Sequence, residues 1–170
     1  YIIGKWGDVS RVDMTFSVTK SYLSTVAGLA YQKGLLSLDE KLKDYIKDGK
    51  FSSEHNKKIT WHHLLNQSSQ WKGNLFGTSD WADRPPRNLS IEELKAQEIP
   101  GPGEAYKYND VRVNLLSFSL LNVLEESLPE VLKREIMDPI GASSSWNWYG
   151  YEKSKIPVSY THLRAHETGY

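Results

Sequence analysis

The chain has 170 residues, and its 21 Lys and Arg balance its 21 Asp and Glu without a basic cluster, which excludes nucleic acid and anionic membranes as expected partners. With 39% hydrophobic residues it can form one globular domain, and with no Cys it can form neither disulfides nor thiolate metal sites. No apolar run approaches the roughly eighteen residues of a membrane span, and no signal pattern opens the chain. The sequence leaves both the localisation and the oligomeric state open.

The N-terminal third of the chain changes its pattern at Ser17. Residues 1–16 carry apolar side chains broken by glycines, which predicts a short strand and a turn. From Val18 to Lys33 the apolar spacing is helical, and Gly34 is a natural left-handed stop. We therefore expect an amphipathic helix directly after Ser17.

The stretch Ser17-Val18-Thr19-Lys20 is the first candidate for chemistry. Side chains three residues apart share a helix face, so the Lys20 amine can reach the Ser17 hydroxyl. Burial and the positive end of the helix dipole favour the neutral amine, which could then accept the serine proton. The same spacing recurs at Ser69-Gln70-Trp71-Lys72, but that copy lies in a predicted loop that would not hold its lysine over its serine.

Short helices are predicted in the middle of the chain. A charged run predicts one from Lys41 to Ile46, and Thr60 is a predicted N-cap for another over residues 61–66. His62 and His63 are expected to pack or cap at the start of that second helix rather than titrate in a mechanism.

A long irregular segment follows from residue 67 to 88, and a loop of this length in a compact domain is often functional. Ser90 and Glu93 then form a predicted capping box for a helix that runs to about Gln97. The sequence Pro100-Gly101-Pro102-Gly103 stops it.

Two helices are predicted in the last third of the chain. Residues 111–124 are strongly apolar and predict a core helix, for which Asp110 is a candidate N-cap. Pro129 is well placed in the first turn of a helix that ends near Met137, before Pro139-Ile140-Gly141.

Several blocks, in this order and spacing, resemble the serine hydrolases related to class C β-lactamases and penicillin-binding proteins. The blocks are residues 14–20, 34–40, 59–69, 102–110 and 136–142. The resemblance covers roughly residues 1–150. The loop from Trp71 to Pro86 is most similar to the branch of esterases and 6-aminohexanoate-dimer hydrolases.

This resemblance implies an α/β (α+β) fold of the β-lactamase/transpeptidase type. The chain is expected to hold the nucleophile helix and the helical portion, about residues 35–140, of a partial domain over residues 1–156, with most sheet strands missing. Residues 157–170 do not resemble the family and are predicted to be a non-native tail of the kind produced by translating a sequencing adapter. Relatives also carry a Lys-Thr-Gly or His-x-Gly strand that completes the oxyanion hole, and neither motif occurs in this sequence.

The resemblance assigns roles to three residues. It makes Ser17 the nucleophile that is acylated, Lys20 its proton acceptor, and Tyr108 the second member of the base system that returns the proton to the leaving group. Asp110 stands where relatives have an Asn, so a substrate-binding role and the N-cap role are both open.

Aromatic residues are the remaining candidates for substrate contact. Trp71, Trp81 and Trp146 are predicted either to line an acyl-substrate cleft or to pack beneath loops. The predicted activity is hydrolysis of a small amide or ester without metal or organic cofactor, by a fragment that is inactive alone. The alternatives are penicillin-binding, peptidase-like or β-lactamase activity, and a non-catalytic fragment or binding module.

Overall fold

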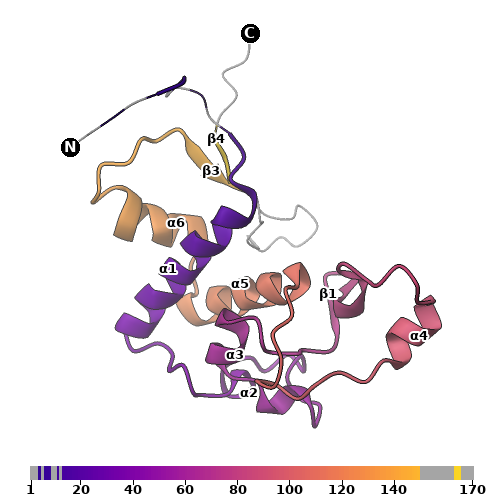
Figure 1. The fold of residues 1–170 in the computed structure, drawn as a ribbon. Coiled ribbons are helices and arrows are strands. Elements are labelled where there is room, and N and C mark those ends of the chain that lie inside the picture. Colours follow the sequence, from indigo (N-terminus) through magenta and orange to yellow (C-terminus); the bar gives the residue numbers. More distant parts are fainter. Residues whose placement is uncertain (1–3, 5, 9–10, 12, 150–162, 166–170) are drawn as a thin grey trace.

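The computed structural model describes residues 4, 6–8, 11, 13–149 and 163–165, and this part of the chain is mostly helical (Figure 1). Residues 4, 6–8, 11 and 13–16 are described and none of them lies in a strand, whereas the other residues of the predicted N-terminal strand and turn lie outside the described residues. In chain order the elements are η1 (Phe16–Val18), α1 (Thr19–Gln32), α2 (Leu42–Tyr45), η2 (Asn56–Lys58), α3 (Trp61–Leu65), β1 (Asn74–Leu75), β2 (Thr78–Ser79), η3 (Asp80–Ala82), α4 (Ile91–Ala96), α5 (Asp110–Leu124), α6 (Leu128–Leu132), η4 (Lys133–Met137), β3 (Trp146–Trp148) and β4 (Leu163–Ala165).

The strands form two short antiparallel pairs. In the β1–β2 hairpin Asn74 lies opposite Ser79, and the two residues of the turn, Phe76 and Gly77, both have positive φ. That turn geometry matches the right-handed twist of the flanking strands. In the second pair the backbones of β3 and β4 run antiparallel, with Trp146 opposite Ala165.

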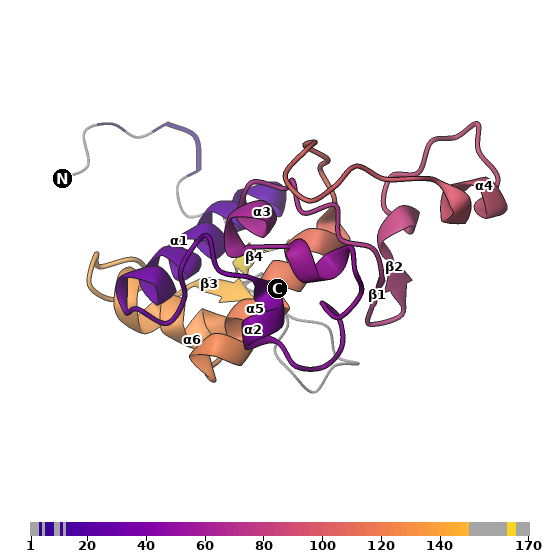
Figure 2. The same cartoon turned by 90° about the horizontal axis from the view of Figure 1, so that it is seen from below.

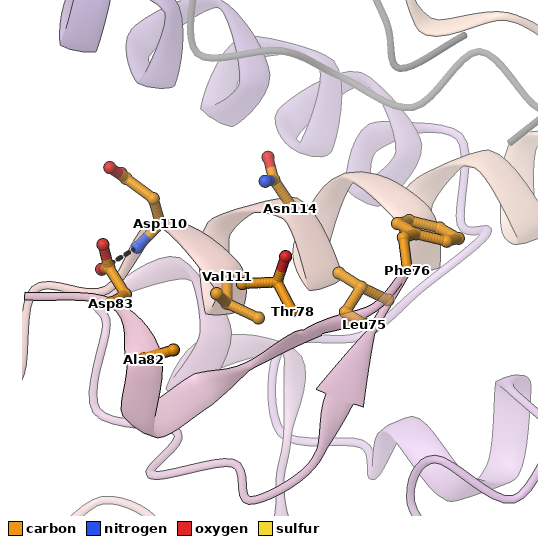
Figure 3. A pocket seen from close by; sticks show the side chains of 8 residues that line it. All are labelled: Leu75, Phe76, Thr78, Ala82, Asp83, Asp110, Val111 and Asn114. Atoms are coloured by element: carbon orange, nitrogen blue, oxygen red, sulfur yellow. Dashed lines mark hydrogen bonds between the residues drawn. The ribbon is translucent and has the colours of Figure 1, made fainter. Parts of the chain in front are cut away.

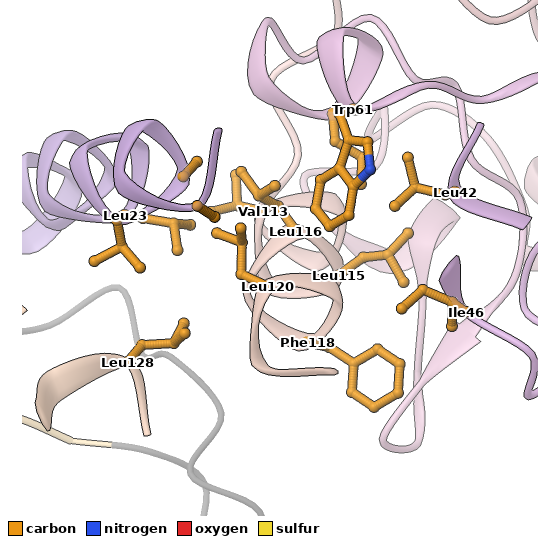
Figure 4. Close-up of a cluster of buried hydrophobic side chains, with 14 of the residues drawn as sticks. Leu23, Leu42, Ile46, Trp61, Val113, Leu115, Leu116, Phe118, Leu120 and Leu128 are labelled. Carbon is orange, nitrogen blue, oxygen red and sulfur yellow. The ribbon is translucent and has the colours of Figure 1, made fainter. Parts of the chain in front are cut away.

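Helix α5 is the centre of the described fold, because it contacts α1, α2, α3 and α6. Nearly all of its side chains from Val111 to Leu120 are buried, as expected for a helix that is apolar on most sides. Figure 4 shows Leu115 and Phe118 on the side of Trp61, while Leu120 lies toward the opposite side of the core. The core helix predicted for residues 111–124 is therefore confirmed.

Helix α1 starts one residue later than predicted and ends where expected. Leu23, Val26, Ala27 and Ala30 bury one face of the helix, and Gly34 takes a left-handed φ of 69° just beyond its end. The 3₁₀ turn η1 precedes α1, so Ser17 lies on the turn that leads into the helix rather than inside it. Figure 2 shows α1 beside α6, with α4 at the far end of the molecule.

Both predicted helix caps in the middle of the chain are confirmed. The side chain of Ser90 accepts from the Glu93 backbone N–H, and Glu93 reaches back to the Ser90 N–H. The same reciprocal arrangement joins Thr60 and His63 at the start of α3, with Nδ1 of His63 accepting from the Thr60 N–H at 3.2 Å. The expected capping role of His63 follows from this contact.

Gly103 is required where the chain passes His63. Its φ is +92°, and a Cβ added there would lie 2.8 Å from Nε2 of His63. Any residue with a side chain would therefore cost energy at this position, because it would strain the backbone and its Cβ would collide with His63. Gly103 of the Pro102-Gly103 block is therefore needed for the fold.

The N-cap of α5 is Asn109, not Asp110. The Asn109 side chain accepts from the Arg112 backbone N–H at 3.0 Å, which is the hydrogen bond that a capping residue makes. The prediction that Asp110 caps the helix is therefore wrong. Asp110 is the first helical residue, and its carboxylate is available for other partners.

No helix in the described part of the chain is both long enough and apolar enough to cross a membrane.

Candidate active site

The structure brings together the three residues that the sequence pattern assigned to catalysis. Ser17 Oγ lies 2.7 Å from the phenol oxygen of Tyr108, and Lys20 Nζ donates to Ser17 Oγ over a longer 3.4 Å. Ser17 is exposed, and both partners are half-buried. Because η1 feeds directly into α1, the serine and the lysine one turn later face the same side.

Tyr108 reaches this point because it immediately precedes α5. The Asn109 cap fixes the start of α5, and the Asn109 backbone N–H donates to the side-chain oxygen of Gln67 at 3.0 Å. Lys107 N–H also donates to the backbone carbonyl of Gln67. The Tyr108 segment is therefore attached on both sides to the loop that follows α3.

Asp110 determines the charge state of Lys20. The Lys20 ammonium and Oδ1 of Asp110 form an ion pair at 2.8 Å. Burial alone would lower the pKa of Lys20, but hydrogen bonding and attraction from Asp110 and Tyr108 outweigh burial, so the net pKa is raised. Burial favours the neutral amine, as expected, but the contacts with Asp110 and Tyr108, which the sequence pattern did not include, outweigh it.

The pKa of Asp110 moves in the complementary direction. Burial alone would raise it, but hydrogen bonds from Lys20 and Arg84 outweigh burial and lower the net pKa. The carboxylate is thus ionised at neutral pH, with one oxygen directed to Lys20 and the other to Arg84. Asp110 is therefore a charged partner of Lys20.

A layer of buried polar groups lies beneath the centre. Arg112, which is 2% exposed, donates to the Trp71 carbonyl at 3.2 Å, to the Gln70 side chain at 3.1 Å and to Asp80 Oδ2 at 3.3 Å. The other oxygen of Asp80 accepts from the Gly73 N–H, and the Asp80 carbonyl accepts from Asn109. This layer holds the loop of residues 70–84 against the first turns of α5.

Unusual backbone conformations gather around the same site. Among the described residues, those other than glycine with positive φ are Phe16, Gln67, Gln70, Phe76, Arg84 and Glu125. Phe16 directly precedes Ser17, and Gln67 and Gln70 belong to the contacts beneath Tyr108. Glu125 is the exception, because it lies at the far end of α5 from this site. Positive φ in such residues is uncommon and is enriched at functional sites.

A pocket of about 200 Å³ opens beside Asp110. Leu75, Phe76 and Val111 supply apolar walls, while Asp83 and Asp110 lie at one end, as Figure 3 shows. The pocket lies between the β1–β2 hairpin and the first turns of α5. Polar and apolar side chains contribute about equally to its lining, because Thr78 and Asn114 add to the two carboxylates.

None of the three tryptophans proposed for substrate contact lines this pocket. Trp71 is 1% exposed in the core, and its indole N–H donates to the Lys50 carbonyl at 2.9 Å. Trp81 is half-buried against Lys95 and Leu94 at a much smaller cavity, and Trp146 packs against the core from β3. This geometry favours packing for Trp71, and a substrate role for these residues stays a prediction.

The second Ser-x-x-Lys sequence forms no comparable centre. Ser69 is fully buried, whereas Lys72 is exposed and its backbone carbonyl accepts from Asn56. Local context distinguishes the two copies, as the sequence predicted.

Sequence reasoning missed two groups of the site. Arg84 gave little signal beyond its place before Pro85, and Arg112 was visible only as a charge between two valines in an apolar helix. A cation inside an apolar run is a sign of a buried ion pair, because buried charges are almost always paired.

Comparisons with known proteins point to one family. The Beta-lactamase family model matches residues 11–167, whereas no match was found among curated proteins. The match includes much of the predicted tail, residues 157–170, most of which lies outside the described residues. The proposed boundary at residue 156 stays a prediction.

Solved structures show the same fold. The octameric penicillin-binding protein homologue from Pyrococcus abyssi is 21% identical with a TM-score of 0.58, over 85% of this chain and 34% of that chain. A class C β-lactamase from Rhodobacter sphaeroides is 19% identical with a TM-score of 0.54, over 88% of this chain and 46% of its own. A provisionally named 6-aminohexanoate-dimer hydrolase from Bacillus anthracis is 15% identical with a TM-score of 0.59, over 95% of this chain and 47% of its own.

The chain thus spans between about a third and a half of the length of these relatives. Its mostly helical fold with a few short strands is the β-lactamase/transpeptidase-like fold predicted from the sequence, represented by part of its length. Since the family model covers most of the chain, the protein belongs to the Beta-lactamase family.

Proposed function

We propose that this chain carries the nucleophilic centre of a serine hydrolase, which cleaves amide or ester bonds of small molecules through an acyl-enzyme at Ser17. The observation that carries the proposal is the position of Ser17 Oγ, 2.7 Å from the Tyr108 phenol oxygen and 3.4 Å from Lys20 Nζ. An activated serine needs a proton acceptor within such a distance, and Tyr108 is the nearer of the two.

The proposed reaction uses Lys20 and Tyr108 as a unit. Because Lys20 is an ammonium in the structure, the pair must first lose one proton to solvent. The proton of Ser17 then passes to this pair as Oγ forms a bond to the substrate carbonyl carbon. Tyr108 then returns a proton to the departing amine or alcohol, which leaves an ester on Ser17. A water molecule attacks that ester, again with transfer of its proton to the pair.

The pocket beside Asp110 supports a substrate with a small acyl group. Its apolar walls are supplied by Leu75, Phe76 and Val111, and its polar end adjoins the ion pair of Asp110 with Lys20. A short aliphatic ester or amide would place its chain in this pocket and its carbonyl near Ser17. The name of the Bacillus anthracis relative, a hydrolase of an aminohexanoate dimer, supports the amide option.

Turnover by this chain is proposed to be slow. Relatives complete the oxyanion hole from a Lys-Thr-Gly or His-x-Gly strand, and neither motif occurs in this sequence. Loss of one oxyanion donor lowers a rate by roughly 100-fold to 1,000-fold. We therefore expect acylation of Ser17 by an activated ester without sustained hydrolysis.

Intact-protein mass after incubation with p-nitrophenyl butyrate tests this proposal. We expect one butyryl group per chain in the wild type and in Ser69→Ala, which alters the buried serine of the second Ser-x-x-Lys sequence. Ser17→Ala should remain unmodified. An equal amount of adduct in Ser17→Ala would contradict the proposal, and continued nitrophenol release that depends on Ser17 would contradict slow turnover.

Penicillin-binding activity is a second candidate, favoured by the names of the Pyrococcus abyssi and Rhodobacter sphaeroides relatives. A fluorescent penicillin distinguishes it, because a covalent, Ser17-dependent label would favour that activity over esterase or amidase chemistry. A chain that forms no adduct with ester or penicillin at any pH would be a non-catalytic fragment.

A further inference from the structure

Arg84 is a cation at the active centre that neither the sequence pattern nor the family resemblance indicates. Its guanidinium donates to Asp110 Oδ2 at 2.6 Å and to both oxygens of Asp83 at 2.8 and 3.0 Å. The guanidinium carbon also lies 4.6 Å from the centre of the Tyr108 ring. The side chain therefore spans from Asp83 across Asp110 and Tyr108.

The backbone at Arg84 is held in an unusual conformation. Its φ is +49°, which a non-glycine residue adopts at some energetic cost, and Pro85 and Pro86 follow it. On its other side, Oδ2 of Asp83 accepts from the Asp110 backbone N–H at 2.7 Å. Figure 3 shows this hydrogen bond joining the loop to the start of α5. The loop is thus anchored so that Arg84 meets Asp110.

Arg84 and Lys20 share a single carboxylate. Asp110 directs Oδ1 to Lys20 at 2.8 Å and Oδ2 to Arg84 at 2.6 Å. A second cation on the same carboxylate weakens its stabilisation of the Lys20 ammonium, because like charges at this range repel. Arg84 is thus placed to oppose the effect of Asp110 on Lys20.

The groups that face Lys20 come from four segments. Helix α5 supplies Asp110, and the segment before α5 supplies the Tyr108 ring, whose centre is 4.8 Å from Lys20 Nζ. The loop after η3 supplies Arg84 with Asp83 behind it, and η1 supplies the uncharged Ser17. Two cations and two carboxylates therefore form the cluster, with Tyr108 between the cations.

We propose that Arg84 is a positioning residue that sets the pH at which Ser17 becomes nucleophilic, by competing with Lys20 for Asp110 and by lying over Tyr108. Both contacts favour loss of the proton from Lys20. The proposal rests on the proposed function at Ser17. In reaction with a fluorophosphonate, Ser17 Oγ forms a bond to phosphorus, fluoride leaves, and the serine proton passes to the pair.

Competitive acetylation tests the charge effect without requiring Ser17 to react. The full chain is treated with trace acetic anhydride between pH 7 and 11, and peptide mass spectrometry measures acetylation of Lys20, and of Tyr108 if it forms a phenolate. At pH 9 we expect acetylation of the pair to be about tenfold slower in Arg84→Gln and about tenfold faster in Asp110→Asn, as expected for loss of one adjacent charge. Arg87→Gln, which alters an exposed arginine three residues away, should match the wild type.

A conservative variant separates charge from folding. Arg84→Lys retains a cation and should restore most of the wild-type acetylation profile, even if it alters the stability of the loop. Unchanged profiles in both Arg84→Gln and Asp110→Asn, or shifts in the same direction, would overturn the proposal. A shift in Arg84→Lys as large as that in Arg84→Gln would also overturn it.

The rate of Ser17 phosphonylation against pH gives the second measurement. Its midpoint should move to higher pH in Arg84→Gln and to lower pH in Asp110→Asn. If the wild type shows no Ser17-dependent label while acetylation shifts in opposite directions, the proposed function fails and the charge effect of Arg84 stands. If Ser17 is labelled and neither profile shifts, the role of Arg84 fails and the proposed function stands.

Discussion

The Ser17 hydroxyl oxygen and the Tyr108 phenol oxygen lie 2.7 Å apart, although 91 positions separate the two residues in the chain. The contact exists because α1 packs against α5, with Ser17 just before one helix and Tyr108 just before the other. Anything that changes the packing of these two helices will therefore change the reactive centre.

Removal of the Tyr108 hydroxyl should slow Ser17 acylation by about 100-fold or more, because a positioned proton-transfer group contributes a factor of this order. Tyr108→Phe keeps the ring between Lys20 and Arg84, so the fold should be retained. The rate of reaction with a fluorophosphonate measures the effect. Tyr106→Phe is a matched control, because that ring is 69% exposed two residues earlier, and it should react at the wild-type rate. Equal rates for the two variants would argue against a role for Tyr108.

The buried pair of Arg112 and Asp80 should dominate the stability of the loop beneath the centre. Arg112→Met leaves the Asp80 carboxylate, which is 4% exposed, without its cation, and loss of one partner of a buried pair costs about 3–5 kcal/mol. Urea unfolding should show this loss for Arg112→Met but not for the exposed Arg87→Met. The double change Asp80→Asn with Arg112→Met should recover part of it. An unaltered unfolding midpoint in Arg112→Met would show that the pair does not support the fold.

His63 should make folding sensitive to acid. Burial, followed by the charge of His62, lowers the pKa of His63, so the unfolded chain binds a proton more readily than the folded chain. The stability contributed by the neutral ring is therefore present above the unfolded value of about 6.5 and is lost as pH falls below it. His63→Gln keeps an acceptor for the Thr60 N–H but does not titrate, so its free energy of unfolding should fall less between pH 7.5 and 5. Identical pH dependence in the variant and the wild type would exclude His63 as the source.

Two glycine substitutions should have opposite effects. Gly103→Ala should destabilise the protein by about 1–3 kcal/mol, because φ is +92° and the new Cβ would meet His63. Gly28→Ala lies on the exposed face of α1 with no atom within 4 Å of the new Cβ, and it should stabilise by about 0.5–1 kcal/mol. Thermal unfolding of both variants measures the difference. A stabilised Gly103→Ala would mean that His63 does not hold the chain at this point.

Local patterns predicted much of the secondary structure correctly. The N-cap at Thr60, the capping box at Ser90 and the end of α1 before Gly34 depend on residues close in sequence, so the sequence alone was sufficient. The cap of α5 was assigned one residue too late because Asn109 and Asp110 are both good capping residues, and side-chain chemistry alone does not distinguish them.

The site could be predicted only in part. Ser17 and Lys20 are neighbours on one turn, and the family resemblance supplied Tyr108. The charge state of Lys20 depends on Asp110 and Arg84, which reach it through tertiary packing. No periodicity in the sequence indicates which carboxylate will meet which cation. The same reason explains why the burial of Arg112 was not predicted, and why the sequence left open whether Trp71 packs beneath loops or lines a cleft.

Peptide mapping after treatment with a fluorophosphonate tests most directly whether Ser17 is the nucleophile of this centre. The full chain is labelled to completion and digested, and the modified residue is identified by mass spectrometry in the wild type, Tyr108→Phe and Ser17→Ala. The structure predicts a single phosphonyl group on Ser17 in the wild type, slower modification of the same residue in Tyr108→Phe, and none in Ser17→Ala. A phosphonyl group on another residue, with Ser17 unmodified, would contradict the account.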